Sequence, residues 1–308
     1  LTLWLLMCGA RVYGYSLAPK DNQPLFDDFF NRKNSSRDFL GKLHHKVGNI
    51  NDYSSLSEYV TEVKPELVFH LAAQPLVQKS YENPIQTWNT NVMGSLNLLE
   101  SLKYLQNSCA AVFITTDKVY ENKEWEHGYR ENDQLGGNDP YSSSKAGMEL
   151  AINSWRNSFC GNGYYQTSRL SIATARAGNV IGGGDWADNR IIPDIVRALK
   201  KQESIQIRNP NSKRPWQHLL EPLAGYLILG EKLFCHQNKC DNLNNPYATS
   251  FNFGPRINSN KSVEQLVEEV LTLWPGEWIE NSNLNLPHES NLLHLISDKA
   301  YEMLGMGI

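Results

Sequence analysis

The sequence predicts an α/β protein: a Rossmann-type doubly wound parallel sheet with a smaller region toward the C-terminus. Through the first half, short apolar runs alternate with longer helical patterns, which is typical of βαβ units. The apolar run 110–114 ends in Thr115, Thr116 and Asp117, and side chains just past a buried parallel strand lie where open α/β sheets bind ligands. Tyr141 and Lys145 follow, four residues apart in a helical pattern.

The elements of the first half are expected in the order strand, helix, strand, helix, strand, helix, strand. Their predicted ranges are 11–17, 53–63, 66–71, 84–105, 110–115, 141–160 and 168–177. A polar loop rich in Glu, Asn and Gly is expected over residues 121–140. Residues 3–8 are predicted to be the end of a core helix.

Beyond Gly178 the pattern changes, because turns become frequent and the strands shorten. We expect helices over residues 191–201, 219–234 and 263–273, and short strands over 205–207 and 250–253. The sequence contains no internal repeat and no low-complexity tract. These differences separate residues 1–178 from residues 179–308.

Composition restricts the classes of function. The chain has 308 residues, 41% hydrophobic and 20% charged, as in ordinary soluble globular proteins. A net charge of −4 provides no basic surface for nucleic acid or acidic membranes. The apolar stretch 3–8 is far shorter than the ~20 residues of a membrane span.

The cysteine content favours a reduced, cytoplasmic protein. The five cysteines are an odd number and are widely dispersed. Cys235 and Cys240 lack a second Cys or His pair at zinc-site spacing, so we interpret them as structural and expect no metal site.

Tyr141 and Lys145 form a candidate acid–base pair. Positions four apart share one face of a helix, so the ammonium of Lys145 is expected beside the Tyr141 phenol, lowering its pKa from the ordinary value of ~10. Such a phenol can accept a proton from a sugar hydroxyl. Taken alone, the same spacing more often marks a solvated helix face, and the Thr-Asp pair at the strand end favours the functional interpretation.

A longer set of segments is far more specific. In order along the chain they are 69–75 (Phe-His-Leu-Ala-Ala-Gln-Pro), 90–94 (Thr-Asn-Val-Met-Gly), 116–118 (Thr-Asp-Lys), 120–125 (Tyr-Glu-Asn-Lys-Glu-Trp), 136–145 (Gly-Gly-Asn-Asp-Pro-Tyr-Ser-Ser-Ser-Lys), 176–186 (Arg-Ala-Gly-Asn-Val-Ile-Gly-Gly-Gly-Asp-Trp) and 214–222 (Arg-Pro-Trp-Gln-His-Leu-Leu-Glu-Pro). Together they closely resemble the CDP-glucose 4,6-dehydratases, a family of extended short-chain dehydrogenases/reductases. The resemblance covers nearly the whole chain.

The resemblance implies an NAD-binding domain over residues 1–178 and a nucleotide-sugar domain over 179–308. It implies NAD as cofactor, CDP-glucose as substrate, a homodimer and a cytoplasmic location, with no metal, nucleic acid or membrane partner. The implied cofactor-binding residues are Asn49, Ile50, Leu71, Ala72, Ala73, Asn91, Tyr141 and Lys145. The implied substrate-binding residues are Gln74, Asn179, Arg190, Arg214 and His218.

The resemblance also implies the chemistry. Tyr141, as a phenolate beside Lys145, would accept the C4 hydroxyl proton, and Thr116 would hydrogen-bond that hydroxyl. Lys145 would also hold the nicotinamide ribose. Asp117 would protonate the departing C6 hydroxyl. Lys118 stands where related dehydratases carry a glutamate as C5 base. A lysine, with an ordinary pKa of ~10.4, is a poor base near pH 7, so Lys118 is expected to be the C5 base, an enolate stabiliser or an ion-pair partner.

The chain departs from the family pattern at several places. It begins inside the expected first helix, so the first strand and the Gly-x-x-Gly-x-x-Gly turn that holds a pyrophosphate are expected to be missing. Its end is expected to be truncated as well. Asn49 replaces an adenine-binding Asp, and its carbonyl still offers an acceptor. The strand 11–17 ends without the acidic residue that holds the NAD ribose.

Two other functions remain open. A nucleotide-sugar epimerase or reductase would also need Tyr141 and Lys145, but it would not need Asp117 and Lys118 to expel water. A chain without a cofactor turn would instead bind a nucleotide sugar, or pair with a partner, without catalysis.

Overall fold

The central element is a four-stranded parallel sheet of order β10-β5-β4-β3. A computed structural model describes residues 1–19, 42–161, 169–239, 245–256, 259–281 and 292–306. The strands are β3 (Leu67–His70), β4 (Cys109–Ile114), β5 (Leu170–Ala177) and β10 (Ser250–Phe253). This confirms the predicted fold class. β10 was also predicted with these bounds.

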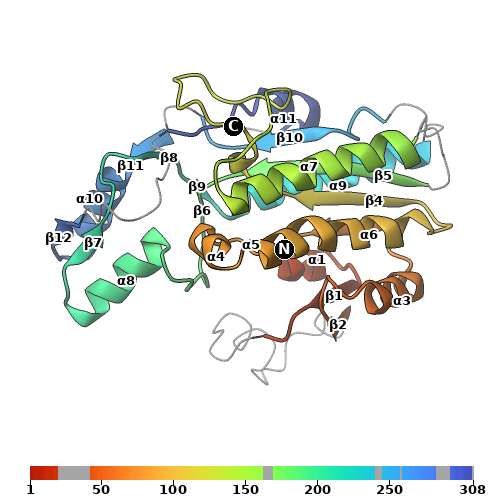
Figure 1. Cartoon of the computed structure of the whole chain (residues 1–308), viewed down its shortest axis with the longest axis horizontal. Coiled ribbons are helices and arrows are strands. Elements are labelled where there is room, and N and C mark those ends of the chain that lie inside the picture. Colours follow the sequence, from red (N-terminus) through yellow and green to blue (C-terminus); the bar gives the residue numbers. More distant parts are fainter. Residues whose placement is uncertain (20–41, 162–168, 240–244, 257–258, 282–291, 307–308) are drawn as a thin grey trace.

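A separate two-stranded parallel sheet, β1 (Val12–Ser16) with β2 (Leu43–Val47), lies below the large sheet in Figure 1. The predicted strand 11–17 is confirmed as β1. β2 was not predicted, because its two histidines and a lysine interrupt the apolar pattern between Leu43 and Val47.

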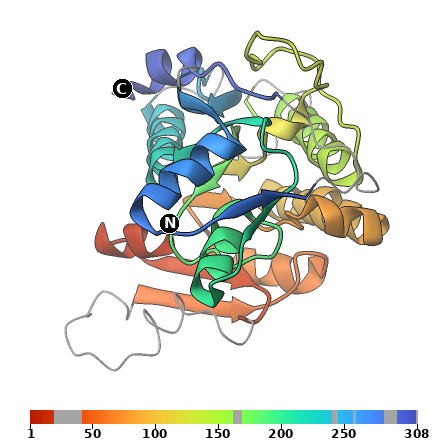
Figure 2. The ribbon, with the colours of Figure 1, turned by 90° about the vertical axis from the view of Figure 1, so that its left-hand side faces the viewer.

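Helices cover both faces of the large sheet (Figures 1 and 2). One face packs against α3 (Tyr53–Val63), α6 (Gly94–Lys103) and α7 (Pro140–Phe159), and the other against α9 (Leu220–Lys239) and α11 (Asp298–Leu304). Along β4, Ala111 and Phe113 belong to the first core, and Ala110 and Val112 to the second. This alternation is the period of a strand buried on both faces. The short helix α1 (Thr2–Met7) places Trp4 against the second core.

The predicted helix 84–105 is interrupted by a π-helical turn. It consists of α5 (Pro84–Trp88), η3 (Asn89–Met93) and α6, and a further helix, α4 (Val77–Glu82), precedes it. The wide turn of η3 places the side chain of Asn91 inside, fully buried. Single π turns of this kind are frequent at functional sites.

A second region stands at the left in Figure 1, beyond the large sheet. It contains α8 (Ile191–Lys201), α10 (Val263–Leu273) and the pairs β7–β12, β8–β11 and β6–β9. These strands are β6 (Val180–Ile181), β7 (Ile205–Ile207), β8 (Lys213–Pro215), β9 (Gln217–His218), β11 (Asn260–Ser262) and β12 (Trp278–Glu280). Its core includes Ile195, Ile205 and Val267.

The predicted elements α8, α10 and β7 are confirmed with their bounds, whereas the other short strands and α11 were not predicted. β10, α9 and α11 follow residue 178 but lie with the large sheet. A domain division at residue 178 stays a prediction.

Three further features concern the described part of the chain. None of its helices is both long and apolar enough to cross a membrane. Cys8, Cys109, Cys160 and Cys235 are free thiols, and Cys240 lies outside the described residues. No group of Cys, His, Asp and Glu residues arranged to hold a metal ion occurs within the described ranges.

The core beneath the sheet gives a stability prediction. Leu229 of α9 is fully buried, whereas Leu220 of the same helix is 51% exposed. Leu229→Ala leaves a cavity, so we expect it to lower the free energy of unfolding by about 2–5 kcal/mol. Leu220→Ala is expected to change it by less than about 0.5 kcal/mol. Denaturant unfolding checks both, and equal effects would contradict this packing.

Candidate active site

The parallel strands bring four chain segments to one edge of the sheet. Residues 71–74 follow β3, Thr115 to Lys118 follow β4, Gly178 follows β5 and Gly254 follows β10. The N-terminus of α7 points to the same edge (Figure 1). Ligands of open α/β sheets bind outside such carboxyl ends.

Helix α7 begins at a well-defined point. The side chain of Asp139 accepts a hydrogen bond from the Ser142 amide at 2.9 Å, and Pro140 occupies the first turn. Tyr141, Lys145 and Glu149 then follow at four-residue intervals on one helix face. All three are buried, with exposed fractions of 8%, 4% and 3%. The face expected from Tyr141 and Lys145 is therefore directed into the protein.

The Lys145 ammonium is buried with few partners. Its Nζ donates to the Ile114 carbonyl at 3.3 Å and lies 3.8 Å from Met148 Sδ. Burial lowers the pKa of Lys145 to about 8, and the Glu149 carboxylate acts in the opposite direction. Burial, with a further contribution from the same ammonium, lowers the pKa of His70, at the end of β3, to about 3, so this imidazole is neutral.

The expected lowering of the Tyr141 pKa is wrong for this structure. Burial raises the pKa of the phenol to about 12. A hydrogen bond with Thr116 and the charge of Arg190 act against this, and Asp117 adds to it. The prediction counted the charge of Lys145 but not the loss of solvent around the phenol.

Thr116, Asp117 and Lys118 form the turn after β4. Thr116 Oγ1 donates to Asp117 Oδ1 at 2.9 Å and accepts from the Lys118 amide at 3.4 Å. Asp117 is only 3% exposed, and burial raises the pKa of its carboxyl. The charges of Lys118 and Arg214 and the hydrogen bond from Thr116 limit the rise. A buried carboxyl of this kind is suited to proton donation.

The carboxyl of Asp117 lies against the main chain of Gly178. A Cβ added at residue 178 would stand 2.0 Å from Asp117 Oδ2 and 2.2 Å from its carboxyl carbon. Only glycine leaves this space open without displacing the carboxyl. Gly178 is held in turn by Gln217, whose Nε2 donates to its carbonyl at 2.9 Å.

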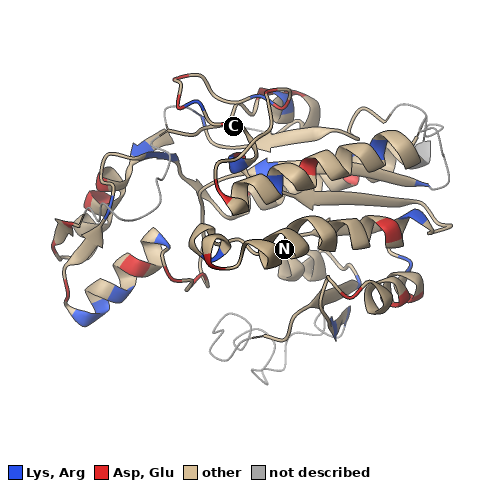
Figure 3. Cartoon of the chain, in the orientation of Figure 1, with Lys and Arg blue, Asp and Glu red and all other residues tan. Residues whose placement is uncertain are grey.

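Two arginines of the second region act electrostatically on these groups. Arg214 of β8 lowers the pKa of Asp117, and Arg190, at the start of α8, lowers that of Tyr141. Figure 3 shows Lys and Arg on α8 and β8. Asn179 directly follows Gly178 in a left-handed conformation with φ of 50°, and its carbonyl accepts from the Gln217 amide.

Asn91 and Gln74 use their amides inside the protein. The Asn91 side chain donates to Ser144 Oγ at 2.8 Å and to the backbone carbonyl of Gln74 at 3.2 Å, and it accepts from the backbone N–H of Gln74 at 2.8 Å. Gln74 bonds to both backbone groups of Leu76 and to Thr87. They connect the segment after β3 to the start of α7.

Of the residues expected near the cofactor, Leu71, Ala72 and Ala73 lie at this edge after β3, whereas Asn49 and Ile50 follow β2 of the separate two-stranded sheet. Asn49, after β2, accepts from the Asn51 amide at 3.0 Å and is exposed, and the carbonyl of Ile50 accepts from Asn97 of α6 at 3.0 Å. Leu71 is 49% exposed, and Ala72 and Ala73 are partly buried.

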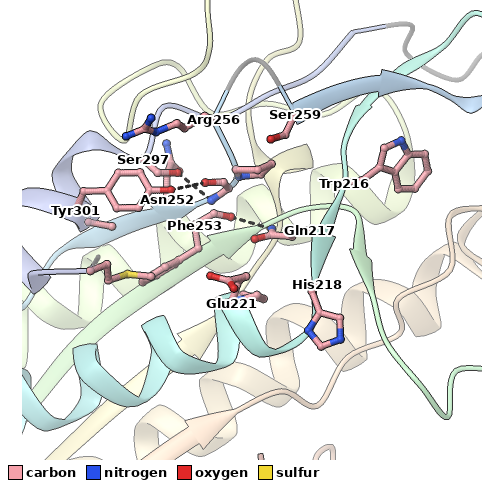
Figure 4. A pocket seen from close by; sticks show the side chains of 15 residues that line it. Trp216, Gln217, His218, Glu221, Asn252, Phe253, Arg256, Ser259, Ser297 and Tyr301 are labelled. Atoms are coloured by element: carbon pink, nitrogen blue, oxygen red, sulfur yellow. Dashed lines mark hydrogen bonds between the residues drawn. The ribbon is translucent and has the colours of Figure 1, made fainter. Parts of the chain in front are cut away.

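His218 lies beside a separate pocket. A cavity of about 390 Å³ is bounded by β9, the start of α9, the end of β10 and α11. In Figure 4, Arg256, Ser297 and Tyr301 stand on one side of this pocket and His218 on the other. Gln217 forms part of its wall and also holds Gly178, so the pocket adjoins the Asp117 site. Thr116, Tyr141 and Lys145 do not line it.

The sequence interpretation missed the buried polar network behind the site. Glu149 pairs with Arg176 of β5 at 2.8 Å, and both are 3% exposed. Two signals were available: a third polar residue at the four-residue spacing of α7, and Thr174 and Arg176 within the strand β5, which is buried along its whole length.

Comparisons with known proteins agree with this geometry. A family model described as GDP-mannose 4,6 dehydratase matches residues 1–244. A CDP-glucose 4,6-dehydratase of Salmonella typhimurium is 45% identical over 307 residues, covering 99% of this chain and 81% of that protein.

Solved structures share the fold. A dTDP-glucose 4,6-dehydratase of Streptomyces venezuelae, solved with NAD, is 19% identical with a TM-score of 0.76, covering 98% of this chain and 86% of that one. A UDP-glucose 4-epimerase of Thermotoga maritima is 20% identical with a TM-score of 0.76, covering 99% and 87%.

The raised pKa of Asp117 predicts a stability change. The folded protein holds this proton to a higher pH than the unfolded chain, whose Asp pKa is ~3.9. The buried charge therefore lowers stability as pH rises. We expect Asp117→Asn to raise the melting temperature at pH 8, with the gain disappearing as pH falls toward ~4.

Thermal melts from pH 4 to 8 check this. Asp188→Asn is the matched control, because the Asp188 side chain is 90% exposed. A lower melting temperature for Asp117→Asn at pH 8 would mean that Lys118, Thr116 and Arg214 outweigh burial.

Proposed function

The chain belongs to the nucleotide-sugar dehydratase family that includes the GDP-mannose and CDP-glucose 4,6-dehydratases, and from this premise we propose that it converts CDP-glucose to CDP-4-keto-6-deoxyglucose. One observation carries the proposal: a buried carboxyl, Asp117, lies in the same site as Tyr141, Thr116 and Lys145. An epimerase or reductase would need the last three but no acid to expel water.

The cofactor we propose is NAD, and the residues at the sheet edge fit two parts of it. The buried Lys145 ammonium donates to the Ile114 carbonyl and lies beside the Met148 thioether. Because an ammonium carries three donors, it can also donate to ribose hydroxyls. Asn49 and Ile50 follow β2, on the side assigned to the adenine. Leu71, Ala72 and Ala73 follow β3, between those two residues and Lys145. When bound, NAD⁺ supplies a hydride acceptor for oxidation, a donor for the later reduction, and a positive charge.

Oxidation at C4 is assigned to the α7 face. Tyr141 accepts the C4 hydroxyl proton and Thr116 orients that hydroxyl, because the two side chains already interact. The neutral phenol must first lose its own proton. The hydrogen bond with Thr116 and the charge of Arg190 favour the phenolate.

Dehydration is assigned to the turn after β4. Once C4 is a ketone, the C5 proton is acidic, and water leaves from C5 and C6. Asp117 donates a proton to the departing C6 hydroxyl, for which its raised pKa suits it. Lys118, partly buried beside Asp117, removes the C5 proton or stabilises the enolate. The hydride taken from C4 returns to C6, so the reaction is redox-neutral.

The diphosphate is assigned to the second region. From that region the charge of Arg190 lowers the pKa of Tyr141, and the charge of Arg214 lowers that of Asp117. A guanidinium group can donate two parallel hydrogen bonds to the oxygens of one phosphate. Asn179 follows the glycine that contacts Asp117. Gln74 holds the segment after β3 through its bonds to Leu76, and His218 lines the adjoining pocket.

We also propose a cytoplasmic homodimer. Trp88 of α5 lies against Gly147 of α7, since a Cβ there would meet the indole at 3.0 Å. Around this contact Ile85, Trp88 and Leu150 are 74%, 40% and 61% exposed. Exposed apolar side chains clustered on two helices favour a protein interface. The free thiols support a reducing compartment.

The proposed reaction predicts a product specific to one substrate. With NAD⁺ and CDP-glucose, the protein is expected to form a 4-keto-6-deoxy sugar, measured by its alkali-induced absorbance, with UDP-glucose and dTDP-glucose assayed in parallel. Asp117→Asn is expected to lower kcat by on the order of 10²–10⁴-fold while NAD⁺ binding is retained. Gly178→Ala should act in the same direction, because its methyl group displaces the Asp117 carboxyl.

Other outcomes select other functions. Product from UDP- or dTDP-glucose alone would replace the substrate assignment. An interconverted hexose without loss of water indicates an epimerase. Bound NAD⁺ and nucleotide sugar with no product would overturn the catalytic proposal.

The interface predicts a response to charge. Leu150→Glu places a carboxylate at its centre, so we expect sedimentation to show monomers where the unmodified protein is a dimer. Leu273→Glu is the control, since Leu273 is 85% exposed on α10. A dimer that persists in Leu150→Glu would place the interface elsewhere.

A further inference from the structure

The Glu149 carboxylate is an extensively hydrogen-bonded buried charge behind the proposed site. Oε2 accepts from Arg176 Nη2 at 2.8 Å and from Thr174 Oγ1 at 2.9 Å. Oε1 accepts from Thr115 Oγ1 at 2.6 Å and from Arg176 Nε at 3.0 Å. A buried carboxylate with this many donors is held as the anion. Burial alone would raise the pKa of Glu149, but Arg176 and the hydroxyls keep it below its usual range.

These bonds join the elements that carry the reaction. Glu149 lies on α7, two turns after Tyr141 and one after Lys145. Thr115 ends the β4 segment and directly precedes Thr116. The hydrogen bond between Glu149 and Thr115 therefore fixes α7 against the strand that delivers Thr116 and Asp117.

Arg176 extends the network to the other strands. Its Nη1 donates to Tyr120 Oη at 2.8 Å, and its Nη2 donates to Ser250 Oγ of β10 at 3.1 Å. The Tyr120 hydroxyl donates to Asn252 Oδ1 at 2.7 Å. The guanidinium thus has a partner on each side and neutralises Glu149 in a region without solvent.

Few ionisable groups act on Lys145. On its own helix the anionic Glu149 acts on it from one turn away, and Tyr141, one turn away in the other direction, is neutral near pH 7. From β3 it meets His70, neutral and hydrogen-bonded to Ser95 Oγ at 2.9 Å. β4 contributes only the Ile114 carbonyl. Of these groups, Glu149 is the anion that favours the charged ammonium.

We propose that Glu149, held by Arg176, is a positioning residue for the reaction: its hydrogen bond from Thr115 fixes α7 on β4 so that Tyr141 meets Thr116, and its carboxylate is the anion one helical turn from the Lys145 ammonium. This inference rests on the proposed oxidation at Tyr141. Glu149 does not touch the reacting atoms, so it acts through Lys145 and Thr115.

The pH dependence of the reaction tests this role. Lys145 must be charged, and a lysine loses its charge as pH rises through its pKa, so Lys145 sets the alkaline limit of kcat/KM. Removing the Glu149 anion destabilises the ammonium. In Glu149→Gln we expect the alkaline limb to move to lower pH by about one pH unit or more. A purely structural role would lower kcat/KM equally at every pH.

Glu149→Gln leaves the Arg176 charge without its partner, so this variant can fail to fold. A second variant tests the proposal in that case. The double variant Glu149→Gln/Arg176→Met removes both charges, and it is expected to fold and to show the same downward shift. Glu100→Gln is the control, since Glu100 lies on the surface of α6 beside Lys103. Its limb should coincide with that of the unmodified protein.

A measurement without turnover separates this inference from the proposed function. In protein labelled with ¹³Cε-lysine, the Lys145 signal, assigned by its loss in Lys145→Arg, should titrate at lower pH in Glu149→Gln than in the unmodified protein. An unchanged titration in both Glu149 variants overturns the inference, even if the unmodified protein forms product. Absence of product in the unmodified protein, with the titration shifted, overturns the proposed function instead.

Discussion

The buried ion pair of Glu149 and Arg176 is the interaction on which the rest of the site depends. Both side chains are removed from water, so each charge is tolerable only because the other is present and the remaining acceptor positions are filled. The pair stands where α7, β4, β5 and β10 meet. Apolar packing brings these elements together, and the directional hydrogen bonds of this pair fix the position of α7 along β4.

Around this ion pair, three side chains at the sheet edge are held in states that lower the stability of the folded protein. Asp117 has a raised pKa, Lys145 has lost most of its solvation, and Tyr141 is a buried neutral phenol. Because residue 178 is glycine, no side chain competes with the Asp117 carboxyl for its space. The two apolar cores supply stability that offsets the cost of holding these groups, as is common where reactivity and stability conflict.

Much of this organisation could be predicted from the sequence. The strand end at Thr116 and Asp117 and the four-residue spacing of Tyr141 and Lys145 are local patterns, and the structure brings these residues to one site. β2 was missed because histidines replace its apolar residues. The direction of the Tyr141 pKa was wrong because burial depends on tertiary packing, which no local pattern contains. The partner of Glu149 is 27 residues away along the chain, so the pair appears only when α7 lies on β5.

The π turn at Asn89–Met93 sets the rotation of α5 about the helix axis relative to α6. An α-helix advances about 100° per residue, and the extra residue of a π turn displaces everything before it by that amount relative to α6. Deleting one residue there would restore regular pitch but would turn α5 by about a quarter of a revolution. Trp88 would leave Gly147, and Asn91 would leave Ser144. A one-residue irregularity thus keeps the outer helix face and the inner polar contact in register.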